Sequence, residues 1–458
     1  MSKSSYSLAE EALSVTQVLH AIDRFGVAFD DDSLVANAGL ILPATLLARL
    51  DLVGLVNERV RLIGRVGGAL PGRKIATLVT SMLAGGTHID HATMLRAGAT
   101  QAVLPFRVMA PSTLGTFLRS FTFGHVRQLD AVIDETIRRA WTTRGLRPGD
   151  RALTVDLDST ICEVHGTQKQ GAAYGYTKQL GYHPLLATRA GTGELLHARL
   201  RKGSSQRGHK HFVQELIARV RRGGATGPIT LRADSGFWSW ELCDTLTKLG
   251  VAWSITVTQN RNIKTAIASI PETAWTKIAY PDNGIAEVAD VLYTTGNRRD
   301  RQRTVRLVVR RTRLTDTTQA MLWPDWRHHA FITSDTKRTP VEADQFHREH
   351  ATVELAIKDL KEGAGLEHCP SGNFSANSAW LACGIIAHNL TRWTARLGEL
   401  HPADQLTVTR TIRTRHFAIP ARLVNRSGRL TLRLPTRWPW ADRFTTALAL
   451  LRSIRLTT

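Results

Sequence analysis

Residues 151–160 read RALTVDLDST, and residues 227–236 read GPITLRADSG. Each stretch is short, apolar and β-branched before it reaches aspartate, which predicts two buried strands that finish at polar side chains. Between them, YHPLLATRAG (182–191) and ELLHARLRKG (194–203) meet at a Gly-Thr-Gly turn, which predicts a hairpin. HKHFVQELIARVRRG (209–223) has apolar residues at helical spacing, so we expect a helix after the hairpin.

The segment after these strands continues with a helix and a strand. WSWELCDTLTKLG (238–250) has the helical pattern, and VAWSITVTQ (251–259) has that of a strand. The complete order is therefore β-β-β-α-β-α-β. An antiparallel opening followed by alternating helices and strands predicts an α/β fold with a mixed sheet and the RNase H-like order, rather than a doubly wound one.

The flanking regions have different patterns. The expected division is a mainly helical, DNA-binding region at 1–150, a catalytic core at 151–400, a β-rich insertion within it at 260–340, and a C-terminal extension at 401–458. STLGTFLRSF (112–121) is a candidate recognition helix of a helix-turn-helix-like unit, although plain helical packing explains the same pattern.

The chain is strongly basic. Sixty Lys and Arg against 39 Asp and Glu give a net charge of +21 over 458 residues. This excess favours a polyanionic partner, DNA or RNA first, over a merely arginine-biased protein. The hydrophobic fraction of 43% excludes a disordered chain.

Cysteine usage and hydropathy indicate the compartment. The four cysteines have neither metal-ligand spacing nor the density of a disulfide scaffold, which predicts core thiols in a reducing compartment. No apolar run is long enough to cross a membrane, and the N-terminus lacks the apolar region of a signal peptide. We expect a cytoplasmic, nucleoid-associated protein without a membrane span.

Three aspartates at the strand ends are candidate ligands. Asp156 and Asp158 lie two residues apart, so both side chains stand on one face of their strand. Two adjacent carboxylates repel unless a positive charge lies between them, and a divalent cation is the usual solution. Asp234 ends the strand expected beside theirs, although it also suits a helix N-cap.

The third acid is expected on the helix at 341–362. His347, His350, Glu354 and Lys361 fall on one helical face, beside a separate apolar stripe. Three converging carboxylates on a basic protein suit two-metal phosphodiester chemistry. We therefore expect two Mg²⁺ (or Mn²⁺) ions held by Asp156, Asp158, Asp234 and Glu354, with Asp158, Asp234 and Glu354 as the catalytic acids.

Four motifs in order resemble the DDE transposases of bacterial insertion sequences. They are DLDST (156–160), HGTQ (165–168), RADSGF (232–237) and HREHATVELAIKDLK (347–361). The last is similar to the Tyr-x2-Arg-x3-Glu-x6-Lys signature of the branch with a β-rich insertion. Its Glu–Lys spacing is kept, and histidines stand at the Tyr and Arg positions. The match of Asp-x-Thr favours Asp158 over Asp156 as the first acid.

The resemblance implies a DNA transposase that cleaves at terminal inverted repeats and joins the ends to target DNA, working as a homodimer in a synaptic complex on double-stranded DNA. The candidate DNA contacts are His347, His350, Lys361, Lys358 and Arg232. The branch often forms a hairpin at the transposon end and holds a flipped base with its insertion, which makes Trp323 and Trp326 candidate stacking residues, although both also suit a core.

Three alternatives remain open. An RNase H-like nuclease that cuts without strand transfer has the same sequence features. A haloacid dehalogenase-like phosphatase would use Asp156 as nucleophile, but the later paired acidic motif at a strand end is missing. A non-catalytic DNA-binding derivative is disfavoured because all three acids are present.

Overall fold

The structure is a computed structural model that describes residues 25–143, 145–175, 178–205, 208–280, 284–295, 302–313, 326–402 and 405–455. The helix expected over residues 8–25 lies almost entirely outside these ranges.

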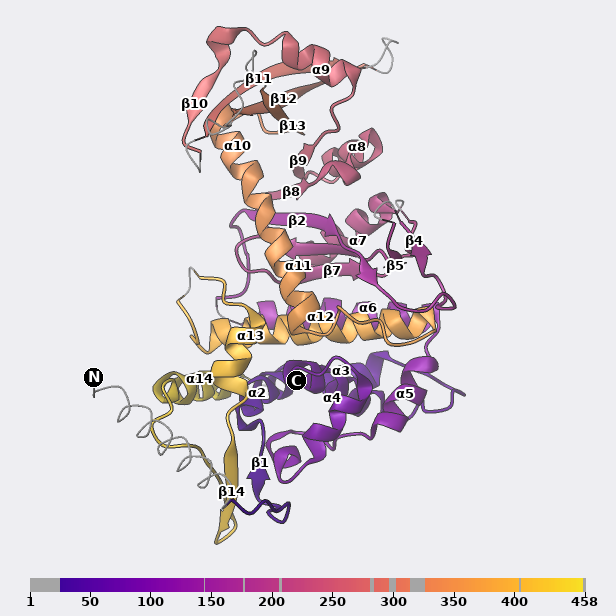
Figure 1. Cartoon of the computed structure of the whole chain (residues 1–458), viewed down its shortest axis with the longest axis vertical. Helices are drawn as coiled ribbons and strands as arrows, with labels where there is room; N and C mark the ends of the chain where they lie inside the picture. The colour runs from indigo at the N-terminus through magenta and orange to yellow at the C-terminus, as the bar shows by residue number, and fades with distance from the viewer. Residues whose placement is uncertain are drawn as a thin grey trace, which may run out of the picture.

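A nine-stranded mixed sheet runs from one end of the molecule to its middle, with the strand order β10-β11-β12-β13-β9-β8-β2-β6-β7 (Figure 1). The strands are β2 (Leu153–Ser159), β6 (Leu185–Arg189), β7 (Leu195–Arg199), β8 (Ile229–Ala233), β9 (Ala252–Thr256), β10 (Thr276–Ile278), β11 (Ile285–Thr295), β12 (Arg303–Arg313) and β13 (Arg327–Thr333). A small second sheet of β3 (Cys162–Glu163), β5 (Leu180–Tyr182) and β4 (Ala173–Tyr174) follows β2.

Five of these strands have the predicted RNase H-like arrangement. β2 pairs antiparallel with β6, which pairs antiparallel with β7. On its other side β2 pairs parallel with β8, which pairs parallel with β9. The crossovers are the helices α7 (His209–Arg222) and α8 (Trp240–Lys248). The predicted order β-β-β-α-β-α-β is therefore confirmed.

The β-rich segment extends the same sheet. β13 pairs antiparallel with β9, with Ile332 opposite Ile255, and β12, β11 and β10 follow in turn. β9 thus has a partner on both sides, which removes an exposed edge from the catalytic sheet. The helix α9 (Arg261–Ala268) also lies in this segment and was not predicted.

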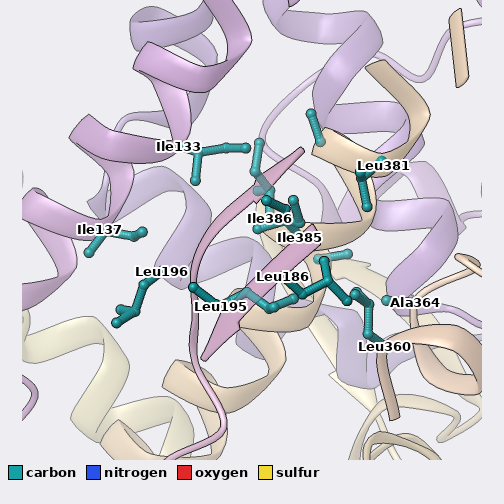
Figure 2. Packing of buried hydrophobic residues seen from close by; sticks show 14 of the residues in the cluster. Ile133, Ile137, Leu186, Leu195, Leu196, Leu360, Ala364, Leu381, Ile385 and Ile386 are labelled. Carbon is teal, nitrogen blue, oxygen red and sulfur yellow. The ribbon is translucent and has the colours of Figure 1, made fainter. Parts of the chain in front are cut away.

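A helical layer covers the other side of the core. Its members are α2 (Ile41–Arg49), α3 (Leu52–Arg59), α4 (Pro71–Leu83), α5 (Pro111–Arg119), α6 (Phe123–Trp141), α12 (Phe374–Leu397), α13 (Thr409–Ile412) and α14 (Ala441–Ser453). α12 is buried along most of its length and lies between the sheet and the N-terminal helices (Figure 1). Figure 2 shows Ile385 and Ile386 of α12 near Ile133 of α6 and Leu186 of β6. One hydrophobic core therefore crosses the boundaries expected near residues 150 and 400.

Two helices connect the insertion to this layer. α10 (Pro340–Arg348) and α11 (Thr352–Gly363) are separated by a 3-10 turn at Glu349–Ala351 and run past the sheet to α12 (Figure 1). Thr339 and Glu342 form a capping box that starts α10. The single helix predicted at 341–362 is therefore two helices, and the turn changes the angular spacing of residues before and after it.

The C-terminal region adds a third sheet, in the order β1 (Leu34–Val35), β14 (Ala421–Arg426) and β15 (Arg429–Arg433). The stretch GRLTLRLP (428–435) predicts the strand β15, whereas β14 was not predicted. All four cysteines are buried and free, as expected for core thiols. Within the described ranges no single helix is long and apolar enough to cross a membrane. The bent helix pair Ala38–Arg49 and Leu52–Arg59 reaches the required length and apolar composition only when the two helices are taken together.

Candidate active site

The strands that carry the first two candidate acids are neighbours. β2 and β8 are parallel, and Leu157 lies opposite Ala233. The next residues along these strands are Asp158 and Asp234, so the two aspartates lie side by side at the carboxyl edge of the sheet. This parallel register gives the adjacency that the sequence order predicted.

The side chain of Asp156 lies on the same face of β2 as that of Asp158, but other residues of the protein enclose it. It is 1% exposed, and Arg232 donates Nε to one carboxylate oxygen at 2.7 Å and Nη2 to the other at 3.0 Å. His350 Nδ1 lies 2.9 Å from Asp156 Oδ1. Protein groups thus occupy and neutralise this carboxylate. The structure therefore does not support Asp156 as a metal ligand, nor as the exposed nucleophile of a phosphatase.

Arg232 was predicted to contact DNA, but it lies in the interior. Its side chain is 1% exposed, donates to the carbonyl of Phe346 and lies 3.3 Å from the carboxylate of Glu349. Its guanidinium also lies 4.8 Å from the ring centre of Phe346. The residue ties β8 to α10 and is not available to a phosphate in this arrangement.

Asp158 has an environment opposite to that of Asp156. Burial, with smaller contributions from the charges of Asp234 and Glu354, raises the pKa of Asp158 to about 6. The amide of Ser159, 2.6 Å from Oδ1, and the nearby His350 oppose this rise only in part. The site therefore holds negative charge that the protein does not neutralise.

Asp234 follows β8 at the same edge. Burial raises its pKa, while the Gly236 amide donates to Oδ1 at 3.1 Å and the charges of His350 and His183 oppose the rise. One side of the residue remains open to solvent. The N-cap interpretation is also correct here, because Asp234 caps the short 3-10 turn Ser235–Phe237.

Glu354 lies in the first turn of α11 and is exposed. It faces a pocket of about 500 Å³ together with Asp158. The lining residues are Asp158, Ser159, Thr160, Glu354, Ile357, Lys358, Lys361, Glu362 and Glu367. Carboxylates and lysines thus share one open pocket, which suits a metal ion and a phosphate.

His347 was predicted on the same face as Glu354, but it is buried. It is 4% exposed, and its two ring nitrogens lie 2.8 Å from Ser254 Oγ and 2.9 Å from Thr256 Oγ1. Its ring stacks on Phe331 at 4.0 Å. Burial lowers its pKa well below the usual value. His347 therefore packs α10 onto the sheet, and a DNA contact by this residue finds no support.

The two lysines of α11 differ in their contacts. Lys361 Nζ donates to the carbonyl of Ile161 at 2.7 Å, so it holds the segment that follows β2. Lys358 is largely exposed and lies 3.8 Å from Glu362. Both line the pocket with Asp158. Lys361 therefore contacts the segment after β2, whereas Lys358 contacts an acid of its own helix.

His183 was not anticipated from the sequence. Its Nε2 lies 2.9 Å from Ser159 Oγ, and its charge acts on Asp234. Burial lowers the pKa of His183. The residue lies two positions before Leu185, which pairs with Ser159, so the antiparallel register brings it close to the end of β2.

The three acids do not form a closed cluster. Among the described residues, no three His, Cys, Asp or Glu side chains are grouped closely enough to hold a metal ion. The prediction that the oxygens of Asp158, Asp234 and Glu354 converge is therefore not met by the side-chain positions, whereas the backbone placement agrees with it. The donor set itself, oxygen ligands with excess negative charge, fits a hard divalent cation.

Comparisons of the whole chain with known proteins give its family. The family model described as "Transposase DDE domain group 1" matches residues 23–456. The chain belongs to this family. A search of curated proteins finds no match. A cryo-EM structure of a piggyBac transposase synaptic complex with hairpin DNA is similar, with 13% sequence identity, a TM-score of 0.41, and coverage of 82% of this chain and 79% of that chain.

Membership in the family confirms the resemblance seen in the sequence. DDE transposases cleave DNA and transfer strands, and they generally use divalent metal ions. The dehalogenase-like alternative is thereby wrong, which agrees with the enclosure of Asp156. The haloacid dehalogenase signature was matched only because both motifs place two aspartates on one strand face.

The insertion of this DDE transposase contains a second pocket of about 680 Å³. Arg311 lies between two tryptophans, 4.2 Å from the ring centre of Trp275 and 4.5 Å from that of Trp326. The indole nitrogen of Trp275 is buried without a hydrogen-bond partner. Trp323 lies outside the described residues. Trp326 is thus half-buried at a pocket wall, and Trp275 was not anticipated.

Two of the described N-terminal helices, α4 and α5, are packed inward. α4 is buried almost throughout, and Lys74 within it donates to the carbonyls of Gly67 and Ala69. α5, the candidate recognition helix, buries Leu114 and Phe117. Both helices therefore fit the packing interpretation that the sequence left open.

Proposed function

We propose that this chain cuts DNA at the ends of a mobile element and joins them to target DNA, with Asp158, Asp234 and Glu354 as its catalytic carboxylates. The observation that carries the assignment is the register of β2 and β8, which sets Asp158 beside Asp234. The opposite states of Asp156 and Asp158 support it. Asp156 is paired with Arg232, whereas no cation among the described residues bonds to Asp158.

The proposed cofactor is Mg²⁺ or Mn²⁺, as two ions held by Asp158, Asp234 and Glu354. Such ions would activate the attacking oxygen and stabilise the leaving oxygen of an in-line displacement. The residues of the chain bind and orient. Lys358 and Lys361 would attract the phosphates entering the pocket. His350 lies in the 3-10 turn before α11, 2.9 Å from Asp156, and would fix the start of α11 relative to β2.

The second pocket supports a role in holding an unpaired base. Val257 N donates to Ala330 O, so β13 begins at the sheet edge where β9 ends. The parallel strands β2 and β8 end at that same edge, with Asp158 and Asp234. Trp326 would stack on a base there, while Lys264 and Arg327 of the pocket lining would contact its backbone.

The experiment is a cleavage and joining assay on duplex DNA that carries the terminal inverted repeats flanking the gene. The parent should cut and join only with Mg²⁺ or Mn²⁺, and Asp234→Asn should retain DNA binding but lose both steps. Asp244→Asn is the matched control, since Asp244 lies on α8 in an exposed ion pair with Arg303. Cleavage by Asp234→Asn at the parental rate would disprove the assignment.

A nuclease without strand transfer is the second candidate, because the same three acids serve either reaction. Joined product distinguishes the two, and cut ends that never appear in target DNA would favour the nuclease. The synaptic homodimer is proposed with the transposase function. Sedimentation of the parent with and without end DNA tests it, and a monomer on paired ends would contradict it.

A further inference from the structure

The hairpin of β14 and β15 carries four arginines on one face. Arg422 lies opposite Arg433, and Arg426 lies opposite Arg429, in the antiparallel register of the two strands. Side chains alternate along a strand, so these two pairs share a face, and all four arginines are exposed.

The other face of this arginine ribbon, Ala421–Arg433, is attached to the protein. Leu423 and Leu432 lie opposite each other and pack against the hydrophobic core. β14 also pairs with β1, and Leu423 N donates to Ser33 O. The arginine face is therefore held outward by packing, and its direction is set by the fold.

The arginine face is short of negative partners. Arg422 pairs with Asp31 at 2.8 Å. For Arg426, Arg429 and Arg433, no carboxylate of the described residues lies within ion-pair distance. Like charges directly opposite each other destabilise a strand pair. A surface on which three of four preoriented arginines lack a carboxylate partner among the described residues suits a polyanion that neutralises them.

The shape of the hairpin favours duplex DNA among polyanions. The strands are joined by the two-residue turn Ser427–Gly428, whose φ values of 50° and 78° are those of a type I′ turn that matches strand twist. A two-stranded ribbon fits the major groove, and paired arginines along it can reach phosphates or guanine edges. Figure 1 shows β14 at the end of the molecule opposite β10 and β11, with the helical layer between it and the catalytic sheet.

We propose that the arginine ribbon is a second DNA contact, which binds duplex DNA away from the cleavage site. The inference rests on the proposed function, because it takes duplex DNA as the substrate. The ribbon would hold DNA that extends beyond the catalytic pocket. It would therefore add affinity for long duplexes and leave the chemistry at the acids unchanged.

The test compares two charge-matched triple variants of the full chain. One carries Arg426→Gln, Arg429→Gln and Arg433→Gln. The control carries Arg96→Gln, Arg452→Gln and Arg455→Gln, which are exposed positions on other elements. Binding to a long random duplex and to a short duplex is titrated across salt concentrations. Asp234→Asn serves as the background, so the measurement does not depend on cleavage.

The ribbon triple should bind the long duplex about 10-fold or more weakly, with a salt slope shallower by about 2 to 3, while the control stays near the parent. A triple Arg→Lys variant at the ribbon positions should keep most of the binding. Equal losses in ribbon and control triples would show only the net charge and overturn the proposal. Loss of binding to anionic vesicles, with duplex binding unchanged, would assign the surface to membranes and also overturn it.

Folding of the ribbon triple is checked by thermal unfolding. If it unfolds early, the single variants Arg426→Gln and Arg429→Gln at the hairpin tip replace it. Each should weaken binding to the long duplex about 3-fold or more, and parental binding by both would disprove the proposal. If the parent does not cleave DNA but its DNA binding still depends on the ribbon arginines, the catalytic assignment is contradicted and the ribbon proposal is not.

Discussion

The two aspartates of β2 lie two residues apart on one strand face, and the protein treats them in opposite ways. Asp156 is 1% exposed, is neutralised by Arg232, and lies within hydrogen-bond distance of His350. Among the described residues no cation bonds to Asp158, and burial, together with the charges of Asp234 and Glu354, raises its pKa to about 6. The first carboxylate is closed and structural, and the second is open and charged against its neighbours.

The difference shows how one motif can serve both stability and chemistry. The closed pair joins β2, β8 and α10, and so fixes the strand ends at which the open acids lie. A metal ion adds little stabilisation to a carboxylate that the protein already neutralises. It stabilises most strongly a carboxylate that is repelled by neighbouring acids. Substitutions in the closed pair Asp156–Arg232 and at the open acid Asp158 should therefore have different effects.

The largest effect is expected from breaking the closed pair. Arg232→Ala leaves the carboxylate of Asp156 buried without its partner, which should lower the free energy of unfolding by about 3–5 kcal/mol. Chemical denaturation measures it. The control is Arg303→Ala, which removes an exposed pair with Asp244 and should cost less than about 1 kcal/mol. Equal small losses in both would mean that the closed pair contributes no more than a surface pair.

The sequence predicted the closed and open acids as one group, and the reason is physical. Strand periodicity places Asp156 and Asp158 on the same face, and this was correct. Which of them meets a cation depends on the position of Arg232, and thus on the strand register, which no local pattern encodes. The resemblance to DDE transposases favoured Asp158, and the structure gives the physical reason.

The helix at 341–362 illustrates the same limit. Its periodicity grouped His347 with Glu354, but the 3-10 turn Glu349–Ala351 breaks the spacing and buries His347. The order of the core strands was predictable because each carries its own apolar pattern. The pairing of β13 with β9 was not, since it joins segments far apart in the chain. β14 was missed because Val424 and Asn425 interrupt its alternation of apolar and polar residues.

The second prediction concerns the open acid without metal. The pKa of Asp158 lies near 6, above its ordinary value of 3.8, so ionising it in the folded state costs stability as pH rises through this range. Asp158→Asn should therefore raise the free energy of unfolding at pH 7.5, on the order of 1–3 kcal/mol, in the presence of a chelator. The gain should vanish toward pH 4, where the parental carboxyl is protonated.

Thermal unfolding at both pH values, with chelator, measures this effect. Asp156→Asn is the informative comparison, because removing the charge of the closed acid strands Arg232 and should destabilise the protein at pH 7.5. If both asparagine variants shift stability in the same direction, the distinction between closed and open acids is wrong.

The third prediction is the pH dependence of metal binding. A cation requires the ionised carboxylate, so protons compete with it below the pKa of Asp158. With that pKa near 6, apparent affinity for Mn²⁺ should fall about 10-fold between pH 7 and pH 5. Calorimetric titration of the protein without DNA measures it. A flat profile over this range would indicate that Asp158 does not ligate the ion.

The smallest effect separates the two lysines of the pocket. Lys361→Ala removes the bond to the Ile161 carbonyl, which should cost about 1 kcal/mol of stability. Lys358→Ala removes only an exposed ion pair with Glu362, at 3.8 Å, and should cost less than about 0.5 kcal/mol.

Both variants lose one positive charge, so a purely electrostatic role of the two lysines would weaken the binding of end DNA equally. Because Lys361 also holds the segment after Asp158, its loss should reduce cleavage in the bound complex as well, whereas Lys358→Ala should reduce binding alone. Single-turnover cleavage at saturating protein separates the two effects. Equal cleavage rates for the two variants would show that Lys361 acts only as a surface charge. The position of Asp158 would then depend on the strand register alone.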